Sequence, residues 1–211
     1  MNKPIFCIVG ESGCGKSTYL DLILNSNRYD YNLKELKYCT TRRKRYSEEN
    51  DYYFMSNDEY LKIKSINPDN IVEYRHYNKY DEDVYYFTLR KNLECEGYDA
   101  LICAASVDQA LSYMKALDDV YIIDIKVELK ERIKRLLNRA NTNNEVLEIC
   151  RRTVEEQDEY RRLDSVNKNI MHIYNDNSKF KYEYSADMLY AVITSSNLNT
   201  IEKYIYDHIK K

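Results

Sequence analysis

One nine-residue stretch near the start of the chain constrains its fold more than any other segment. The sequence GESGCGKST at residues 10–18 fits G-x-x-x-x-G-K-[ST], the pattern of a phosphate-binding loop. A short apolar run at residues 4–9 indicates a buried strand before it, and apolar residues at helical spacing follow it as far as residue 24. A strand, a glycine turn and a helix N-terminus direct several backbone N–H groups at one point, which makes an anion site.

Glycine usage supports this interpretation. Average usage would place roughly 15 glycines in a chain of this length, whereas this chain has four. Three of them, Gly10, Gly13 and Gly15, lie in the loop, where the backbone has to approach a ligand closely. Lys16 adds a positive charge for terminal phosphates, and the Ser17 hydroxyl is placed to ligate Mg²⁺. The competing interpretation, an ordinary strand-to-helix turn that mimics the pattern, is disfavoured by this context.

The composition excludes several classes of protein. A net charge of −3 with 32% charged residues gives no sign of a nucleic-acid partner. No run reaches the ~18 apolar residues of a membrane span, and residues 4–9 are too short for a signal peptide. The six cysteines form no C-x-x-C pair, so we expect reduced core thiols and no disulfide or zinc site. We therefore expect a cytoplasmic monomer or homodimer without membrane or nucleic-acid partners.

The order of predicted elements indicates an α/β protein. Strands alternate with helices, which predicts a parallel sheet flanked by helices. Short strands between about residues 34 and 90 predict a small antiparallel subdomain inserted in that sheet. Residues 177–197 fit no element. The predicted strands are 33–39, 51–54, 71–77, 84–88, 100–104, 120–125 and 170–174, and helices are expected at about 56–63, after a cap at Ser106, and at 128–137, 144–162 and 200–209.

A basic run, TTRRKR at residues 40–45, follows the first of these strands after the loop. Arg42 and Arg45 are three residues apart, and Tyr52 follows them. Two guanidinium groups and a phenol can grip a phosphate through charge-assisted hydrogen bonds. Taken alone, the run is equally well explained as a solvated basic loop.

The run does not stand alone, because six motifs in order over residues 4–176 resemble the guanylate kinase family, which phosphorylates GMP. The loop is similar to that family's G-P-S-G-x-G-K-S-T, with Glu11 in place of proline. The others are TTRRKR at 40–45 with Glu48 and DYYF at 51–54, IVEY at 71–74, YYFT at 85–88, RLLNR at 135–139 with Arg152 and Gln157, and IYND at 173–176.

The resemblance implies a P-loop kinase fold: a parallel helix-flanked sheet, a small inserted acceptor-binding β subdomain and an arginine-rich lid. It implies one domain, with a core of about 1–33, 89–134 and 163–211, an acceptor-binding part of about 34–88 and a lid of about 135–162. It further implies ATP-dependent conversion of GMP, or dGMP, to the diphosphate with Mg²⁺, a step of purine nucleotide metabolism.

Carried over residue by residue, the resemblance assigns the sites. ATP would be bound by Gly10, Ser12, Gly13, Cys14, Gly15, Lys16, Ser17, Thr18 and Asn175, with Ser17 on the metal. The acceptor phosphate would be bound by Arg42, Arg45, Tyr52 and Tyr86, and guanine by Glu73 (N1–H and 2-amino group) and Thr88 (O6). Catalysis would fall to Lys16 and Arg42, with Arg135, Arg139 and Arg152 closing over the phosphates; these three have no obvious acidic partner nearby in the sequence.

Some residues depart from the family pattern. Cys103 and Ala105 stand where an Asp-x-Asp pair is usual, Tyr38 replaces a serine that contacts guanine, and Phe87 replaces a glycine. They motivate a second hypothesis, a kinase of the same fold that acts on another nucleotide or a ribosyl phosphate. A third, a binding module without catalysis, is disfavoured by the intact loop and lid arginines. For Glu73 the competing interpretation is a structural salt bridge to Arg75 or Lys79.

Overall fold

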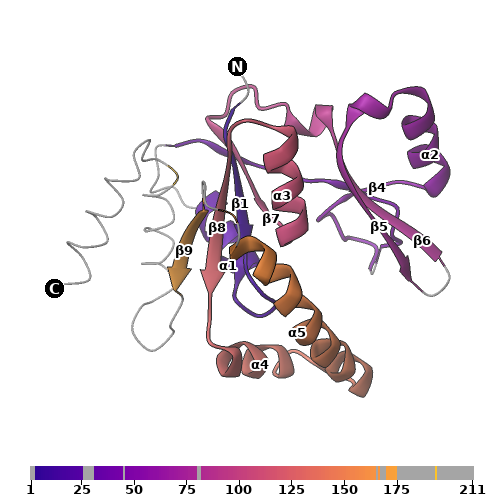
Figure 1. The fold of residues 1–211 in the computed structure, drawn as a ribbon. Helices are drawn as coiled ribbons and strands as arrows, with labels where there is room; N and C mark the ends of the chain where they lie inside the picture. Colours follow the sequence, from indigo (N-terminus) through magenta and orange to yellow (C-terminus); the bar gives the residue numbers. More distant parts are fainter. Residues whose placement is uncertain are drawn as a thin grey trace.

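The computed structural model describes residues 3–25, 31–44, 46–79, 82–164, 166, 170–174 and 193. Within these residues the strands form a five-stranded sheet in the order β2-β7-β1-β8-β9 and a four-stranded sheet in the order β4-β3-β6-β5. Figure 1 shows the small sheet on one side of the main sheet. The main sheet is parallel throughout and consists of β1 (Ile5–Val9), β2 (Leu33–Glu35), β7 (Ala100–Ala104), β8 (Val120–Lys126) and β9 (Ile170–Tyr174).

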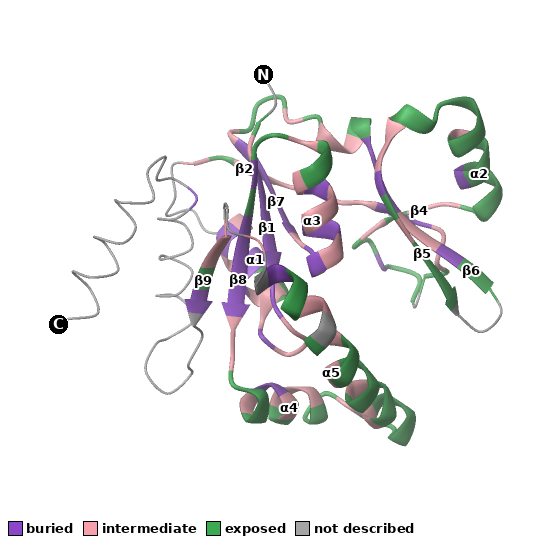
Figure 2. Cartoon of the chain, viewed as in Figure 1, coloured by how far each residue is buried: buried purple, intermediate pink, exposed green. Residues whose placement is uncertain are grey.

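The central strand β1 is buried on both faces, as a strand between two helical layers should be. On one face, Phe6 and Ile8 share a core with α1 (Lys16–Leu24). On the other face, Cys7 and Val9 share a core with α3 (Val107–Ala116). Figure 2 shows the buried strands of the main sheet beside the more exposed small sheet. The apolar run before the loop is therefore the buried strand that the sequence predicts.

Helix α2 (Asn57–Ile66) packs against the small sheet. Tyr60 of α2 is buried and stacks on Tyr85, with 4.3 Å between the ring centroids. The helix begins with the predicted capping box between Ser56 and Glu59. The sheet consists of β3 (Cys39–Thr40), β4 (Tyr53–Phe54), β5 (Ile71–Lys79) and β6 (Glu82–Leu89), with 3₁₀ turns at Pro68–Asn70 and Arg90–Leu93. Strands β3 and β4 pair in parallel, in contrast to the antiparallel arrangement expected, because residues 41–52 carry the chain back between them.

The predicted strand at residues 33–39 is wrong, because the chain changes sheets within it. Leu36 is buried against the main sheet, and its N–H donates to the carbonyl of Ile102. The chain then leaves at residues 37–38 and enters β3 of the small sheet. The residue pattern of this segment does not reveal that its two halves pair with different strands. The other predicted strands are confirmed, with ends that differ by at most two residues.

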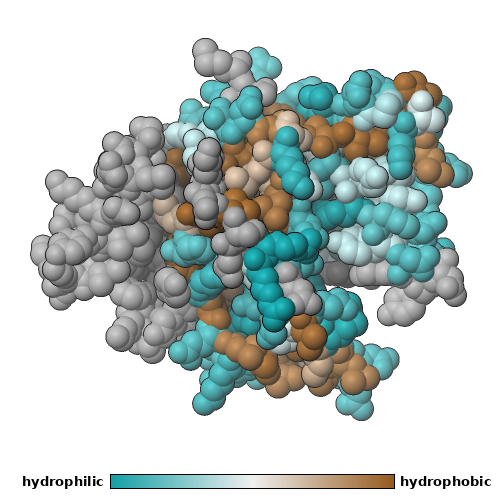
Figure 3. All heavy atoms as spheres, viewed as in Figure 1, coloured by the Kyte–Doolittle hydropathy of each residue, from teal (hydrophilic) through white to brown (hydrophobic). Residues whose placement is uncertain are grey.

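Helices α4 (Leu129–Leu137) and α5 (Asn143–Asp164) come after β8 in the sequence. They expose several large apolar side chains, and such side chains gather in this region of the surface in Figure 3: Leu129, Leu137, Leu147 and Val154. The expected helix at 200–209 lies outside the described residues. Of residues 177–197, Ile193 is described, and its side chain is buried in the core beside α1.

The cysteines are all free, as predicted, but they do not all lie in the core. Cys150 is exposed on α5 and Cys95 is half-buried, so the expectation of core thiols is wrong for these two. Among the described residues, no helix combines the length and apolar character needed to cross a membrane.

Candidate active site

The phosphate-binding loop connects β1 to α1 and packs so closely on its neighbours that two of its glycines have no room for a side chain. Gly13 has a φ of 85°, and a Cβ there would lie 2.9 Å from the carbonyl oxygen of Arg132. A Cβ on Gly10 would lie 2.3 Å from the sulfur of Cys14 and 2.9 Å from the carbonyl oxygen of Ile125. Both glycines are therefore required by the close approach of the loop to α4 and β8.

Lys16, the first residue of α1, folds its side chain back over the loop. Its ammonium group donates a hydrogen bond to the carbonyl of Gly10. Cys14 is buried below it, and burial raises the pKa of the thiol, although the charge of Lys16 opposes this. Ser17 is exposed on the first turn of the helix. The lysine is thus half-buried at the loop, and the hydroxyl beside it is accessible.

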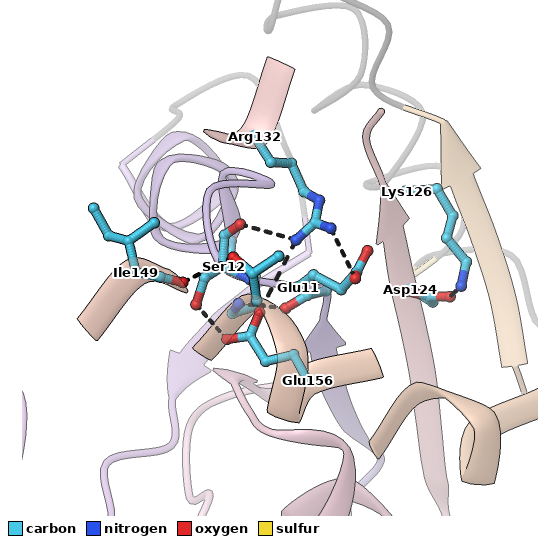
Figure 4. A network of polar contacts seen from close by, with 10 residues as sticks. Glu11, Ser12, Asp124, Lys126, Arg132, Ile149 and Glu156 are labelled. Atoms are coloured by element: carbon cyan, nitrogen blue, oxygen red, sulfur yellow. Dashed lines mark hydrogen bonds and ion pairs between the residues drawn. The ribbon is translucent and has the colours of Figure 1, made fainter. Parts of the chain in front are cut away.

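Arg132 of α4, which the sequence analysis missed, holds the loop from the other side (Figure 4). Its side chain is 3% exposed, and its guanidinium donates to a Glu11 carboxylate oxygen at 2.8 Å and to the Ser12 carbonyl at 3.3 Å. A signal existed: Arg132 falls on the apolar stripe of its helix, with Leu129, Ile133 and Leu136 at helical spacing. A charge in such a stripe indicates a buried ion pair.

Of the three predicted lid arginines, Arg135 contacts the loop. Its Nη1 donates to the Gly13 carbonyl at 3.2 Å, and its Nε pairs with Glu131 at 3.2 Å. The expectation that it lacks an acidic partner is wrong, because Glu131 lies one helical turn before it. Arg139 and Arg152 are exposed, and neither guanidinium has an ion pair with another described residue.

A second cluster brings together three of the four residues predicted to bind the acceptor phosphate. The Arg42 guanidinium lies 5.3 Å from the Tyr52 ring centroid, and the rings of Tyr52 and Tyr86 are 5.7 Å apart. Glu49, which sequence reasoning missed, is 1% exposed and pairs with Arg42 at 2.6 Å. Its hydrogen bond raises the pKa of Arg42 further above the ordinary value. Arg45 lies outside the described residues.

The predicted guanine-binding pair is engaged within the chain. Glu73 is 4% exposed; one carboxylate oxygen accepts from Thr88 at 3.2 Å, and the other lies 3.5 Å from Nε of Arg75. Burial raises the pKa of the Glu73 carboxyl, partly offset by the Arg75 charge and the Thr88 bond. The Thr88 hydroxyl also bonds the Tyr113 hydroxyl at 2.5 Å. Since a hydroxyl has one proton, Thr88 cannot donate to Glu73 and to a base at once.

The pair extends to the main sheet. Nη1 of Arg75 donates to the hydroxyl of Ser106, the N-cap of α3, at 3.1 Å. Its guanidinium lies 5.7 Å from the ring centroids of both Tyr38 and Tyr86. Arg75 is therefore held by an acid, a hydroxyl and two phenol rings at the junction of the two sheets, and the salt bridge considered for Glu73 is present.

Comparison with known proteins gives a likeness of fold. Neither protein-family models nor curated proteins match the chain. The crystal structure of guanylate kinase from Anaplasma phagocytophilum is similar, with a TM-score of 0.59 and 19% identity over 98% of this chain and 95% of that chain. The structure of TT1252 from Thermus thermophilus has a TM-score of 0.48 and 13% identity over 93% of this chain and 100% of that chain.

The chain has a P-loop kinase fold. This likeness concerns the fold alone and leaves the ligands and substrates to be argued from the site.

In this kinase fold the carboxyl ends of the main-sheet strands carry few acids. Cys103 and Ala105 at the end of β7 are buried among apolar residues. Asp124 lies on β8 opposite Val9, fully buried, with Lys126 at 2.8 Å and His172 at 2.9 Å from one carboxylate oxygen. Its other oxygen has no hydrogen-bond partner among the described residues. No three His, Cys, Asp or Glu side chains of the described part of the chain group as metal ligands. Asn175, assigned to the adenine, lies outside that part.

Proposed function

We propose that this protein transfers the γ-phosphoryl group of ATP to a nucleoside monophosphate, with GMP or dGMP as the first candidate acceptor. One observation carries the proposal, which is that the protein has two cationic sites. The first is the phosphate-binding loop with its close-packed glycines and Lys16. The second is the cluster of Arg42, Tyr52 and Tyr86 at the small sheet. A loop alone serves any nucleotide-binding protein, whereas a second cationic cluster with phenol hydroxyls suits a second phosphate.

The proposed chemistry needs positioning and charge neutralisation more than covalent help. Lys16 would exchange the Gly10 carbonyl for a phosphate oxygen, and Arg135, already at the loop, would add a second positive charge. Arg42 would hold the acceptor phosphate. The attacking oxygen belongs to an anionic phosphate, so no strong general base is required. Mg²⁺ would neutralise phosphate charge when bound, and the exposed hydroxyl of Ser17 would hold it.

The division of labour along the chain belongs to the same proposal. Residues of about 34–88 would bind the acceptor, and about 135–162 would form the lid that excludes water during transfer. Arg139 and Arg152 lie on this lid with exposed side chains, which suits residues that engage phosphates after closure. The remaining segments would form the ATP-binding core.

A specific observation favours a second candidate acceptor. The N1–H and 2-amino group of guanine would present two N–H donors to Glu73, and the guanidinium of Arg75 already lies beside that carboxylate as an ion partner, with Nε 3.5 Å from one oxygen. Thr88 has its proton engaged as well. An acceptor that does not depend on the guanine edge, such as another nucleotide or a ribosyl phosphate, fits this arrangement without displacing Arg75.

A panel of acceptors tests both candidates. The protein is incubated with ATP and Mg²⁺ and with GMP, dGMP, AMP, CMP, UMP or ribose 5-phosphate, and ADP and the phosphorylated product are measured by chromatography. A preference for GMP over AMP of about 10³-fold or more supports guanine reading. Turnover with comparable GMP and AMP rates supports the second candidate. If no acceptor is phosphorylated although the protein still binds ADP, the kinase proposal is contradicted and a binding module is favoured.

A further inference from the structure

Ser12 directs two donors of the phosphate-binding loop at a carboxylate of the same chain. Its backbone N–H donates to one oxygen of Glu156 at 2.7 Å, and its hydroxyl donates to the other oxygen. Glu156 comes from α5, 144 residues later in the sequence. Figure 4 shows the glutamate reaching the loop from below, opposite Arg132.

This contact places an internal anion where the loop is built to hold an external one. A carboxylate has a negative charge and two oxygens that accept hydrogen bonds, as a phosphate does. The backbone N–H and hydroxyl of Ser12 are donors of the kind that bind phosphate in such a loop. While Glu156 accepts from both, a phosphate oxygen cannot take the same two donors.

The surroundings stabilise the carboxylate in this position. Nη1 of Arg132 lies 4.0 Å from Glu156 while the same guanidinium donates to the Ser12 carbonyl and to Glu11. The Glu156 side chain is 17% exposed, so its hydrogen bonds are shielded from most of the solvent. The ammonium of Lys16 is meanwhile held by the Gly10 carbonyl. The chain itself thus occupies both donors of Ser12 and the ammonium of Lys16.

We propose that Glu156 is a built-in competitor for the phosphate position of the loop, so that a nucleotide must displace it to bind. Displacement releases α5 from Ser12, which couples occupation of the loop to movement of the lid helix. The inference rests on the proposed function in one respect, that the ligand of the loop is a nucleotide phosphate. It adds that the empty protein is held in a self-occupied state.

The size of the effect follows from the fraction of molecules with a free loop. The apparent dissociation constant is the intrinsic constant divided by that fraction, so a loop that is free in about one molecule in ten binds roughly tenfold more weakly. Removing the charge of Glu156 should recover most of this factor. A glutamine keeps the length of the side chain but cannot accept from both donors as an anion.

Calorimetric titration of the full chain with ADP and, separately, with inorganic pyrophosphate tests this. Pyrophosphate reports the phosphate position without the base. We expect Glu156→Gln to bind both ligands about 5- to 10-fold more tightly than the unaltered protein. Glu155→Gln is the matched control, because Glu155 is the preceding residue, is 58% exposed and is paired with Arg151. The affinity of this variant for ADP and pyrophosphate should equal that of the unaltered protein. Hydrogen exchange in residues 149–160 should change on ADP binding in the unaltered protein and much less in Glu156→Gln.

Equal or weaker binding by Glu156→Gln overturns the inference, as does an equal gain in Glu155→Gln, which would indicate a general charge effect. If Glu156→Gln does not fold, Glu156→Ala, which also removes the carboxylate, gives the same readout. Failure of the unaltered protein to bind either ligand would overturn this inference and the proposed function together. If the protein transfers phosphate but Glu156→Gln binds ADP and pyrophosphate no more tightly than the unaltered protein, the competitor role of Glu156 is overturned and the proposed function stands.

Discussion

The hydroxyl of Tyr38 donates a hydrogen bond to the carbonyl of Ala104, 2.9 Å away and 66 residues later. This bond joins the start of β3 to the end of β7, and so ties the small sheet to the main sheet. Burial raises the pKa of Tyr38 well above its ordinary value, which keeps the phenol protonated as a donor. The ring therefore fills the junction beside Arg75 and Tyr52, where a smaller residue would leave space for a base.

Two substitutions of Tyr38 distinguish the effect of its hydrogen bond from the effect of its side-chain volume. Tyr38→Phe keeps the ring and loses the bond, so we expect a loss of about 1 kcal/mol in the free energy of unfolding and an unchanged acceptor profile. Tyr38→Ser opens a cavity at a cost of roughly 3 kcal/mol and should raise kcat/KM for GMP relative to CMP. Both are measured by denaturant unfolding and steady-state kinetics. If the ratio of kcat/KM for GMP to kcat/KM for CMP is unchanged in both variants, Tyr38 does not determine which acceptor is used.

Arg75→Ala removes the internal partner of Glu73. A buried carboxylate without its cation should lower the stability by about 3–5 kcal/mol. GMP should then raise the Tm of the variant more than AMP does, because guanine supplies N–H donors to Glu73 and adenine does not. Thermal melts with each nucleotide measure this, and Arg43→Ala, which removes an exposed ion pair with Glu82, is the control. Equal shifts with GMP and AMP would mean that Glu73 does not read guanine.

Lys16→Ala should lower the rate of transfer by about 10²- to 10³-fold, since the ammonium acts on charge that develops in the transition state. The Tm should change little, because the side chain is half-buried and contacts a single carbonyl of the loop in the described structure. Lys62→Ala, on the exposed face of α2, is the control. Normal turnover by Lys16→Ala would show that the loop is not the catalytic phosphate site.

Glu73 and Glu59 should affect stability with opposite dependence on pH. The pKa of Glu73 is raised by burial, so the native state holds its proton more tightly than the unfolded chain. Its contribution to stability falls as the pH rises above the unfolded pKa of about 4.3 and through the higher folded pKa. The pKa of Glu59 is lowered by hydrogen bonds from Ser56, so its contribution is present above about pH 4.3 and is lost as the pH falls through the folded pKa.

Melting temperatures of the unaltered protein, Glu73→Gln and Glu59→Gln between about pH 3 and about pH 7 check the signs. The Tm difference between the unaltered protein and Glu73→Gln should shrink with rising pH, while the difference from Glu59→Gln should grow. Parallel curves for the two variants would contradict the assignment.

Arg132→Ala leaves the carboxylates of Glu11 and Glu156 without their shared cation and should cost about 3 kcal/mol or more. Adding Glu11→Gln to that variant should restore part of the loss, because one uncompensated charge disappears. A double-mutant cycle by denaturant unfolding measures the coupling. Strictly additive losses would show that the pair contributes no coupling energy.

Local patterns predict the elements of this fold well, and the reasons are visible in single segments. The apolar run of β1 and the Ser56 capping box specify their structures within a few residues. Residues 33–39 fail because their two halves belong to different sheets: β2 pairs with β7, and β3 pairs with β4 and β6. Periodicity specifies a strand but not its neighbour.

In the candidate site, too, residues of a local motif are predictable and residues that act through distant partners are not. Lys16 and the loop glycines belong to one contiguous motif, so their placement is predictable. Glu49, Arg132 and Glu156 are not, because their roles come from ion pairs and hydrogen bonds formed on folding. The sequence predicts Arg75 or Lys79 as a possible partner of Glu73, and the structure shows the pair with Arg75, two residues away on the same strand.

The central position of β1 has a consequence for synthesis of the chain. Its neighbours are β7 and β8, and Cys103, which pairs with Cys7, is made 96 residues later. At about 5–20 residues per second, β1 waits roughly 5–20 s for its first partner strand. Its five apolar residues are then a segment that a nascent chain must keep from other chains. Gly10 is packed against the Ile125 carbonyl of β8, so the loop reaches its folded shape only after translation has passed that strand.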